Sequence, residues 1–283
     1  MVSISKMDCG AVASRSDCRS MQLKMLDAIV DLCEQNNLRY YLSGGTLLGA
    51  VRHKGFIPWD DDIDINMPRP DIEKLYQLTG GRIQEYEFAR NGDDPYMPAC
   101  QWYRLYSHEI IIENFFGGAS DIPRYHPLFV DIFPIDGFPE GDLASLLYSW
   151  KLIFIRKMLG VSWHDQIIAK NTLAFIAHVI AFLPSKIVGY KNWKKWFQHE
   201  ARRYDFDDCK YVGVTSTVLY LPREKVPKKE YLESVPMEFE GKTYSAPGNY
   251  DLYLSQLYHD YMKLPPIEKQ KSHHSFKMYW RKH

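Results

Sequence analysis

The sequence predicts a core that combines helices with a mixed β-sheet, of the α+β or α/β class. Three observations support this prediction. Apolar residues at helical spacing before and after the first short strands indicate amphipathic helices. Apolar runs bounded by Gly, Pro and Asn indicate strands. A group of aspartates lies on one of these predicted strands, and 46% hydrophobic residues in a chain of 283 are enough for a full core.

The first predicted elements lead to a glycine turn. Residues 20–35 predict an amphipathic helix, and residues 38–43 predict a short strand that stops at Gly44 and Gly45. A second predicted helix begins at Thr46. A glycine turn that opens a helix offers backbone amides and the positive end of the helix dipole, which both favour phosphate. Most such turns bind nothing, so these residues become candidate substrate contacts only in combination with the aspartates that follow.

The aspartates lie in the sequence Asp-Asp-Asp-Ile-Asp-Ile-Asn, residues 60–66. Alternation in a strand would place Asp60, Asp62 and Asp64 on one face and Asp61 on the other. Residues two apart on a strand are about 6.5–7 Å apart, so Asp62 and Asp64 could hold one divalent ion between them. Burying this much like charge without a cation would be costly. Because the donors are all oxygens, the pattern predicts magnesium or manganese.

The acidic run has two other interpretations. A calcium-binding EF-hand loop would use Asp62, Asp64, Asn66 and Glu73, but its sixth position requires Gly and is Met67, so we reject it. A solvated acidic loop stays open. The isoleucines between the aspartates favour a strand with one buried face, and with it a catalytic metal site.

A cationic cluster, Arg52-His53-Lys54, lies between the glycine turn and the aspartates. Arg52 and Lys54 would donate hydrogen bonds to the phosphates of a substrate. For each of these residues taken singly, a solvated loop is an equally good interpretation.

A further carboxylate, Asp131, interrupts the apolar run 128–133. A lone charge in a buried strand needs a partner, and the usual partner is a metal or an arginine. Arg104 is one candidate partner, and we include it among the candidate substrate-binding residues. Asp136, which lies between Pro134 and Gly137, is predicted to be a turn residue.

Beyond the aspartates the chain continues with helix and strand and then changes in composition. Residues 69–79 predict a helix, residues 87–90, 102–106 and 110–113 predict strands, and residues 117–127 predict a surface loop. From about Gly141 the sequence becomes helical in character. We therefore predict a catalytic core over residues 1–140, a helical insertion over 141–204, and a C-terminal part over 205–283 that completes the core and ends in a basic tail.

One segment of the helical insertion, residues 186–197, combines lysines with aromatic residues at helical spacing. Such a segment can lie at a membrane surface, where it would bring an enzyme to a lipid-linked acceptor. The alternative is a surface helix whose aromatic side chains pack on the protein, and we favour it because surface helices commonly show this pattern. The tail, residues 269–283, is assigned no chemistry and is expected to be a flexible end or a weak surface anchor.

Charge, cysteines and hydropathy restrict the class of protein. Lys plus Arg and Asp plus Glu both number 35, so charge gives no argument for a nucleic-acid partner. The five cysteines are odd in number and never spaced as a metal or redox pair, which fits free thiols in a reducing compartment. We see no signal-peptide pattern, and the longest near-apolar run, residues 173–183, is too short to span a bilayer. We expect a cytoplasmic protein, with peripheral contact at the inner face of the membrane as an open alternative.

Residues 41–64, from the glycine turn through the aspartates, closely resemble the LicD family, which includes phosphocholine transferases of bacterial surface glycans and is related to fukutin. Residues 130–137 and 250–266 also resemble the family, in the same order. The resemblance implies a nucleotidyltransferase-type fold, here an α+β core with a mixed sheet, flanking helices and the helical insertion.

The resemblance also implies roles for particular residues. Gly44 and Gly45 match the family's glycine turn. Asp62 and Asp64 match its metal aspartates, and Asp131 matches the third carboxylate that such folds place on a neighbouring strand. These three aspartates are therefore the candidate catalytic residues and ligands of Mg²⁺ or Mn²⁺, with Asp131 also the first candidate for a general base.

The implied reaction is attack by a sugar hydroxyl on a CDP-activated donor such as CDP-choline, with release of CMP. The acceptor would be a cell-surface glycan or its lipid-linked precursor, the first candidate cargo is phosphocholine, and ribitol or glycerol phosphate comes next. An acidic two-metal site does not itself select the phosphorus that is attacked. A nucleotidyltransferase that releases pyrophosphate is therefore the alternative enzyme, and a non-catalytic glycan- or membrane-binding protein is a third hypothesis.

Overall fold

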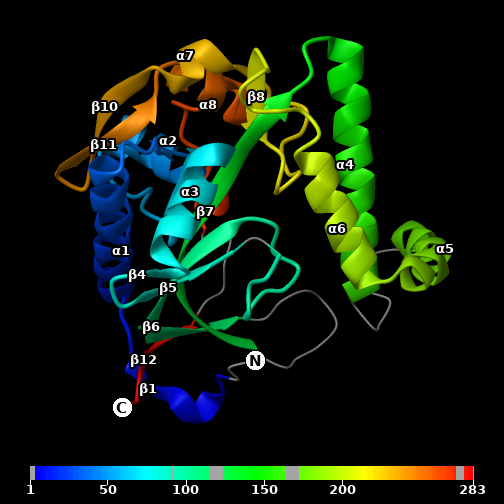
Figure 1. The fold of residues 1–283 in the computed structure, drawn as a ribbon. Coiled ribbons are helices and arrows are strands. Elements are labelled where there is room, and N and C mark those ends of the chain that lie inside the picture. Colours follow the sequence, from blue (N-terminus) through cyan, green and yellow to red (C-terminus); the bar gives the residue numbers. More distant parts are fainter. Residues whose placement is uncertain (1–3, 91, 115–123, 164–171, 272–276, 283) are drawn as a thin grey trace.

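The computed structural model describes residues 4–90, 92–114, 124–163, 172–271 and 277–282. Its α-helices are α1 (Arg15–Gln35), α2 (Gly44–His53), α3 (Arg69–Thr79), α4 (Asp142–Trp163), α5 (Thr172–Val188), α6 (Tyr190–Ala201), α7 (Lys228–Leu232) and α8 (Tyr250–Tyr258). Helices α1, α2 and α3 pack on a central sheet, whereas α4, α5 and α6 stand together to one side of it (Figure 1).

The sheet is mixed. Its strands are β1 (Cys9–Val12), β2 (Tyr41–Leu42), β3 (Asp64–Pro68), β4 (Arg82–Ile83), β5 (Tyr86–Ala89), β6 (Tyr103–Asn114), β7 (Arg124–Phe138), β8 (Tyr211–Val214), β9 (Val226–Pro227) and β12 (Lys277–Arg281). The order is β1-β12-β6-β7-β3-β2, with β5 and β4 continuing from β6, and β8 and β9 from β7. Strands β3 and β7 are parallel, and the other pairs are antiparallel. A separate hairpin joins β10 (Ser234–Phe239) to β11 (Lys242–Pro247). This architecture confirms the predicted α+β class.

Several predicted elements have different ends in the structure. The strand predicted over 38–43 is only β2, and the helix predicted from Thr46 begins at Gly44. Helix α1 begins at Arg15, before the predicted residue 20, because Ser14 and Asp17 form a capping box in which each side chain accepts a hydrogen bond from the other residue's amide. The strands predicted over 102–106 and 110–113 are parts of one long strand, β6, with a shift of register between them.

Two segments predicted to be irregular contain strands. The predicted surface loop 117–127 overlaps the start of β7 at Arg124, and residues 117–123 lie outside the described residues. The tail was expected to be a flexible end or a weak anchor, but it contributes β12 between β1 and β6. Met278 and Trp280 of this strand pack against the main core, which explains why it joins the sheet.

The buried residues form two hydrophobic clusters. The larger cluster lies between the sheet, α1, α2, α3, α8 and the β10–β11 hairpin. The smaller one joins Phe138 at the end of β7 to the inner faces of α4 and α6. The division at residues 140 and 204 stays a prediction, although a separate cluster is what a helical subdomain would need.

The aromatic residues of segment 186–197 are distributed unevenly. Trp193 and Phe197 of α6 are buried in the smaller cluster, while Trp196 is 43% exposed. Packing on the protein therefore accounts for most of the aromatic pattern in this helix. Among the described residues, none of the helices has the length and apolar character that crossing a membrane requires.

Candidate active site

The glycine turn lies directly against the aspartates. Gly44 has a φ of +51°, and a Cβ atom added there would stand 2.9 Å from Oδ2 of Asp64. A Cβ atom at Gly45 would stand 2.4 Å from Oδ2 of Asp60. Because real Cβ atoms do not approach that closely, only glycine allows the start of α2 to meet both carboxylates. The structure thus brings the glycines at the start of α2 into contact with the aspartates that follow them in the sequence.

Thr46 and Ser43 hold the backbone of Asp64. The Thr46 hydroxyl accepts a hydrogen bond from the Asp64 amide at 2.9 Å, and the Ser43 amide donates to the Asp64 carbonyl at 3.0 Å. Thr46 was predicted as a substrate contact. Its hydroxyl instead has a structural partner here, and its contact with substrate stays a prediction.

The strand predicted over residues 60–66 begins only at Asp64. The Asp60 amide donates a hydrogen bond to the carbonyl of Ile57. Two side chains of α1 bind the backbone of the same segment: Arg19 donates to the carbonyl of Asp60 at 2.7 Å, and Gln22 donates to the carbonyl of Asp61 at 3.1 Å. Because this segment lacks strand geometry, strict alternation fails.

The prediction that Asp61 points away from its neighbours is wrong. One carboxylate oxygen from each of Asp60, Asp61 and Asp62 lies within 4.8 Å of the other two. In the described parts of the chain, Asp64 and Asp131 do not belong to this closest group of acids. Asp60, which the sequence analysis did not select as a site residue, therefore joins the candidates. The spacing of residues in the sequence did not predict that Asp60 lies against Gly45.

Asp64 and Asp131 are direct neighbours on the parallel strands β3 and β7. The Asp131 amide donates to the carbonyl of Ile63 at 3.0 Å, which anchors this register. Burial raises the pKa of Asp64 well above its usual range, and the charges of Asp62 and Asp131 add to the increase. Burial likewise raises the pKa of Asp60 to about 8, with the Asp62 carboxylate as the next cause. This crowding of carboxylates favours either the uptake of protons or the binding of a cation.

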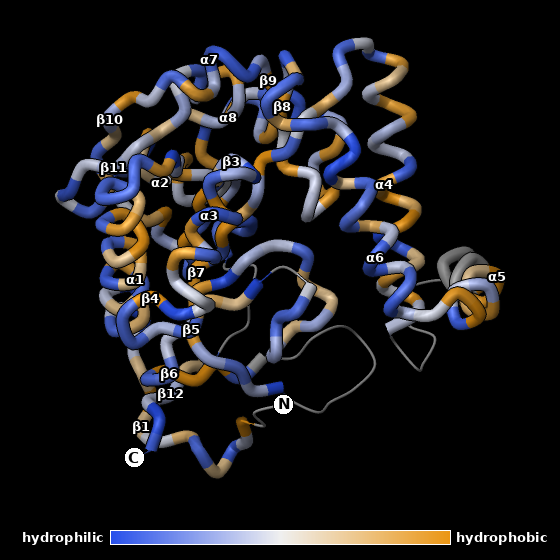
Figure 2. Tube along the Cα trace, viewed as in Figure 1, coloured by the Kyte–Doolittle hydropathy of each residue, from blue (hydrophilic) through white to orange (hydrophobic). Residues whose placement is uncertain are grey.

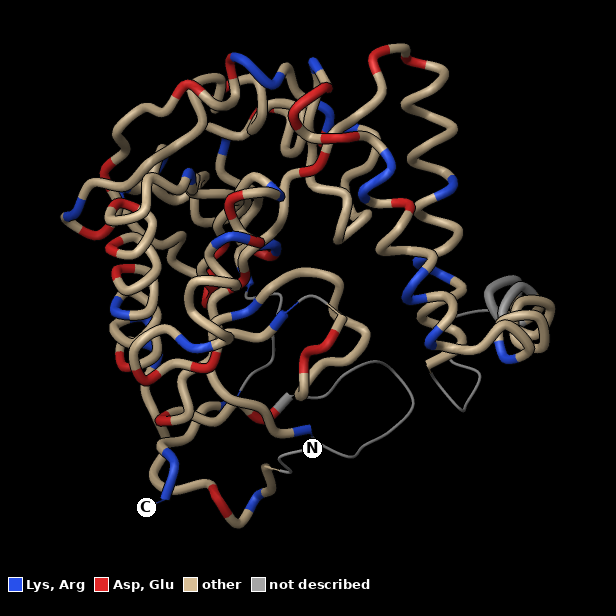
Figure 3. The backbone as a smooth tube through the Cα atoms, in the orientation of Figure 1, with Lys and Arg blue, Asp and Glu red and all other residues tan. Residues whose placement is uncertain are grey.

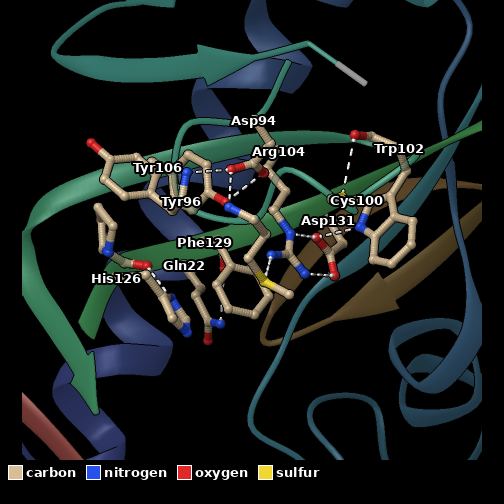
Figure 4. A network of polar contacts seen from close by, with 12 residues as sticks. Gln22, Asp94, Tyr96, Cys100, Trp102, Arg104, Tyr106, His126, Phe129 and Asp131 are labelled. Atoms are coloured by element: carbon tan, nitrogen blue, oxygen red, sulfur yellow. Dashed lines mark hydrogen bonds and ion pairs between the residues drawn. The ribbon is translucent and has the colours of Figure 1, made fainter. Parts of the chain in front are cut away.

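Asp131 has the arginine partner that the sequence analysis named as one alternative. Arg104 donates from Nε to Oδ1 of Asp131 at 2.5 Å and from Nη2 to Oδ2 at 3.3 Å, and Trp102 donates from Nε1 to Oδ1 at 2.8 Å (Figure 4). Burial raises the pKa of Asp131, whereas the Arg104 guanidinium acts to lower it. The role of Asp131 as a metal ligand stays a prediction, since its carboxylate already has two donors.

Arg104 is buried and only 4% exposed. Its guanidinium carbon lies 4.2 Å from the centre of the Phe129 ring (Figure 4). Near it, the Tyr106 hydroxyl donates a hydrogen bond to Asp94 at 2.7 Å. The ring packing fixes the position of the Arg104 side chain, which supports its role as the partner of Asp131. Contact between Arg104 and a substrate stays a prediction.

The other predicted cations lie at the far end of α2. Arg52 is about 12 Å along the helix from Gly44, and Lys54 follows the helix at a φ of +59°. Arg52 donates to the carbonyl of Tyr261 at 2.8 Å. The structure therefore does not bring Arg52 and Lys54 to the glycine end of α2, and their contact with phosphate stays a prediction.

Asp136 is not a turn residue, so that prediction is wrong. It lies in β7 and is buried, and it accepts hydrogen bonds from Arg69 at 2.7 and 2.9 Å and from Thr215 at 2.6 Å. A Cβ atom at Gly137 would stand 2.5 Å from the carbonyl oxygen of Tyr204. Glycine is required here for close packing rather than for a turn.

Two tyrosines beside the acids were not selected from the sequence. The rings of Tyr220 and Tyr258 meet edge to face with centroids 5.7 Å apart. Burial raises the pKa of both phenols, and the Asp64 carboxylate is among the smaller causes, so it lies within electrostatic range of both rings. With 20 tyrosines in the chain, composition could not single out this pair.

The arrangement meets the requirements of a hard divalent cation. Its donors are carboxylate oxygens, and its acids are partly or fully buried and mutually repulsive. The adjacent start of α2 has no side chain that caps its amides. Uncapped amides at a helix start bind anions such as phosphate. The chemistry that fits is phosphoryl transfer at a metal beside a phosphate-binding helix.

Comparisons with known proteins agree with this geometry. Residues 37–144 match the family described as LicD/FKTN/FKRP, nucleotidyltransferase domain. Over 270 residues the chain is 32% identical to "Lipopolysaccharide cholinephosphotransferase LicD" of Haemophilus influenzae, which covers 89% of this chain and 92% of that protein. An uncharacterised protein of Rickettsia typhi is 54% identical over 146 residues, 42% of this chain and 46% of its own. A segment of 52 residues, 18% of this chain, is 44% identical to 10% of "Ribitol 5-phosphate transferase FKRP" of Homo sapiens.

Proposed function

The chain belongs to the LicD family, and from this premise we propose that it transfers a phospho-substituent from a CDP-activated donor to a sugar hydroxyl, with release of CMP. Phosphocholine from CDP-choline is the first candidate cargo, because the relative that matches nearly the whole chain is a cholinephosphotransferase acting on lipopolysaccharide by its name. The acceptor would be a cell-surface glycan or its lipid-linked precursor. The observation that carries the proposal is the contact of the glycine turn with Asp60 and Asp64.

The start of α2 would bind the donor's phosphates. The amides of its first turn have no side-chain cap, and Gly44 and Gly45 present no side chain that could hinder an approaching phosphate. Asp60 and Asp64 stand against the same two glycines. Donor phosphates and carboxylates would repel one another unless a cation lay between them.

Asp62 and Asp64, together with Asp60 and with Asp131 as a further ligand, would hold Mg²⁺ or Mn²⁺. When bound, such an ion neutralises charge on phosphate oxygens and lowers the pKa of a coordinated hydroxyl. Arg104 and Trp102 fix the orientation of the Asp131 carboxylate through three hydrogen bonds. Asp131 is the carboxylate we assign to accept the proton of the acceptor hydroxyl, because it lies beside Asp64 at the proposed metal site.

The identity of the cargo has a second candidate. The local identity to a ribitol 5-phosphate transferase favours CDP-ribitol as the alternative donor. Nearby aromatic faces, such as those of Tyr220 and Tyr258, would suit the quaternary ammonium of choline better than a polyol.

Product analysis tests the proposal. The protein, magnesium and an acceptor glycan are incubated with CDP-choline, CDP-ribitol or CDP-glycerol in parallel, and nucleotide products are separated by chromatography. We expect CMP and a new phosphodiester on the glycan, fastest with CDP-choline. Pyrophosphate from CTP, with no CMP from any CDP-linked donor, would instead establish a nucleotidyltransferase.

A further inference from the structure

The helices beside the sheet expose an unusual amount of apolar surface. Eleven of the nineteen exposed large apolar side chains in the described part of the chain lie on α4, α5 and α6. Trp150 of α4 is 61% exposed, and Ile180 of α5 is 70% exposed. Figure 2 shows hydrophobic residues along α4 and α5, away from the main body of the protein. Apolar patches of this kind usually mark an interaction site.

On each of the two helices the exposed residues form one stripe. They are Leu143, Leu146, Leu147, Trp150 and Phe154 on α4, and Ile176, Val179, Ile180, Leu183 and Ile187 on α5. Both sets follow the same spacing, i, i+3, i+4, i+7 and i+11, which places them on a single face of each helix. The face of α4 opposite its stripe is buried against α6 and Phe138. We call these two stripes the outer apolar face.

The same part of the chain is strongly basic. Residues 141–204 contain ten Lys or Arg and three Asp or Glu, a net charge of +7, so the rest of this neutral chain carries −7. Two of the ten pair with acids of the core, Lys194 with Asp93 and Arg202 with Glu73. Exposed lysines of α4 and α6, Lys157, Lys191 and Lys195, contribute to the remaining excess. Figure 3 shows these helices with basic residues along them.

Charge decides between two occupants of the outer apolar face. A second copy of the chain would bring two regions of charge +7 together, which opposes association. An anionic lipid surface would attract the lysines and at the same time bury the apolar stripes and Trp150. Exposed tryptophan beside lysines is typical of the membrane–water interface.

We propose that the outer apolar face binds the surface of an anionic membrane, with α4 and α5 lying against the lipid. The charge of the helices and their apolar stripes favour a membrane as the binding partner. The benefit of membrane binding rests on the proposed function, since a lipid-linked acceptor would be presented at the membrane surface. Of the apolar residues of segment 186–197, the surface includes only Ile187, because Trp193 and Phe197 of α6 are buried.

Contacts of α6 tie this region to the active site. Tyr190 donates to the carbonyl of Pro98, and Lys194 donates to the carbonyl of Gly92 at 2.6 Å. The segment they hold continues into Trp102, which donates to Asp131. Binding at the outer apolar face would thus place the active site at a defined position relative to the lipid surface.

Co-sedimentation with vesicles tests the proposal. The purified protein is mixed with vesicles of phosphatidylglycerol and phosphatidylcholine, or of phosphatidylcholine alone, without donor or acceptor. We expect binding to the anionic vesicles that weakens as salt is added. Ile180→Glu and Trp150→Glu should each weaken it about tenfold or more, because each removes a large apolar side chain from the interface and adds a negative charge.

Ile267→Glu is the matched control for Ile180→Glu. Ile267 is 80% exposed and lies outside the three helices, so the same change of side chain should leave vesicle binding at the wild-type level. Equal binding by Ile180→Glu and wild type, or no binding of wild type to anionic vesicles, would overturn the proposal. A wild-type dimer in size-exclusion chromatography that Ile180→Glu dissociates, without vesicle binding, would assign the face to a second copy.

The two proposals fail separately. CMP release with a soluble acceptor should be unchanged in Ile180→Glu, because the substitution lies outside the active site. Vesicle binding by a protein that releases no CMP would overturn the proposed function alone. CMP release by a protein that does not bind vesicles would overturn only the proposal that the outer apolar face binds a membrane.

Discussion

Arg104 and Asp131 face one another on β6 and β7 and form a buried ion pair, with Nε of Arg104 at 2.5 Å from Oδ1 of Asp131. Asp64 lies on the other side of Asp131, as its partner on β3. The Asp131 carboxylate thus lies between the Arg104 guanidinium, which it stabilises, and the Asp64 carboxylate, which it repels. Substitution by asparagine should therefore lower the stability of the protein at Asp131 and raise it at Asp64.

Asp131→Asn should lower both activity and stability. The substitution leaves the buried Arg104 guanidinium without its charge partner, which typically costs about 3–5 kcal/mol. Thermal unfolding should show a lower Tm than wild type in chelator. The double variant Arg104→Met/Asp131→Asn should lose less stability than the sum of the two single variants. An additive result would mean that the pair contributes no coupling.

Asp64→Asn should remove activity and raise the metal-free Tm. The amide keeps the size of the side chain and removes a buried charge that Asp62 and Asp131 repel, so the apo protein gains stability. Turnover should fall at least about a hundredfold, as is common when a charged group of a phosphotransfer site is lost. Asp31→Asn on the exposed face of α1 is the control and should behave as wild type in both measurements. A metal-free Tm below that of wild type would contradict the repulsion described here.

Gly44→Ala should be far more damaging than Gly80→Ala. Both glycines have a positive φ, +51° and +59°, so both substitutions incur similar backbone strain. A Cβ at Gly44 would meet the Asp64 carboxylate at 2.9 Å, whereas nothing lies within 4 Å of a Cβ at Gly80. We expect loss of turnover only for Gly44→Ala. Equal effects of the two variants on turnover would show that contact with Asp64 is not what requires glycine.

Glu224→Gln should stabilise the protein increasingly as the pH rises. Burial raises the pKa of Glu224 from 4.5 to about 8. Between these values the unfolded chain releases a proton that the folded protein keeps, so this group lowers stability as pH rises, by about 1.4 kcal/mol for each pH unit at most. Glutamine removes this dependence. The measurement is the Tm of both proteins across that range, and a difference that does not vary with pH would disprove the assignment.

Local pattern predicted much of this fold and site. Helix α3, the end of α1 and the strand around Asp131 follow from periodicity and turn residues. Arg104 was named as a partner of Asp131 because a buried charge in a strand has few ways to be satisfied.

The errors came from contacts that join distant parts of the chain. Residues 60–63 alternate in sequence as a strand would, but side chains of α1 bind the carbonyls of Asp60 and Asp61, and the strand begins only at Asp64. Asp136 resembled a turn residue because Arg69 and Thr215, which satisfy it, are remote in sequence. Arg52 is separated from the glycines by the length of α2, and its contact with phosphate stays a prediction.

CMP release from CDP-choline in the presence of chelator, followed by addition of magnesium or manganese, tests the central claim most directly. Asp60, Asp61 and Asp62 bring carboxylate oxygens within 4.8 Å of one another, and burial raises the pKa of Asp60 and of the adjoining Asp64. A divalent cation would stabilise this group of oxygens and like charges. We expect turnover to disappear in chelator and to return with either ion. Full turnover in excess chelator would contradict the assignment of this acidic cluster as a metal-dependent catalytic site.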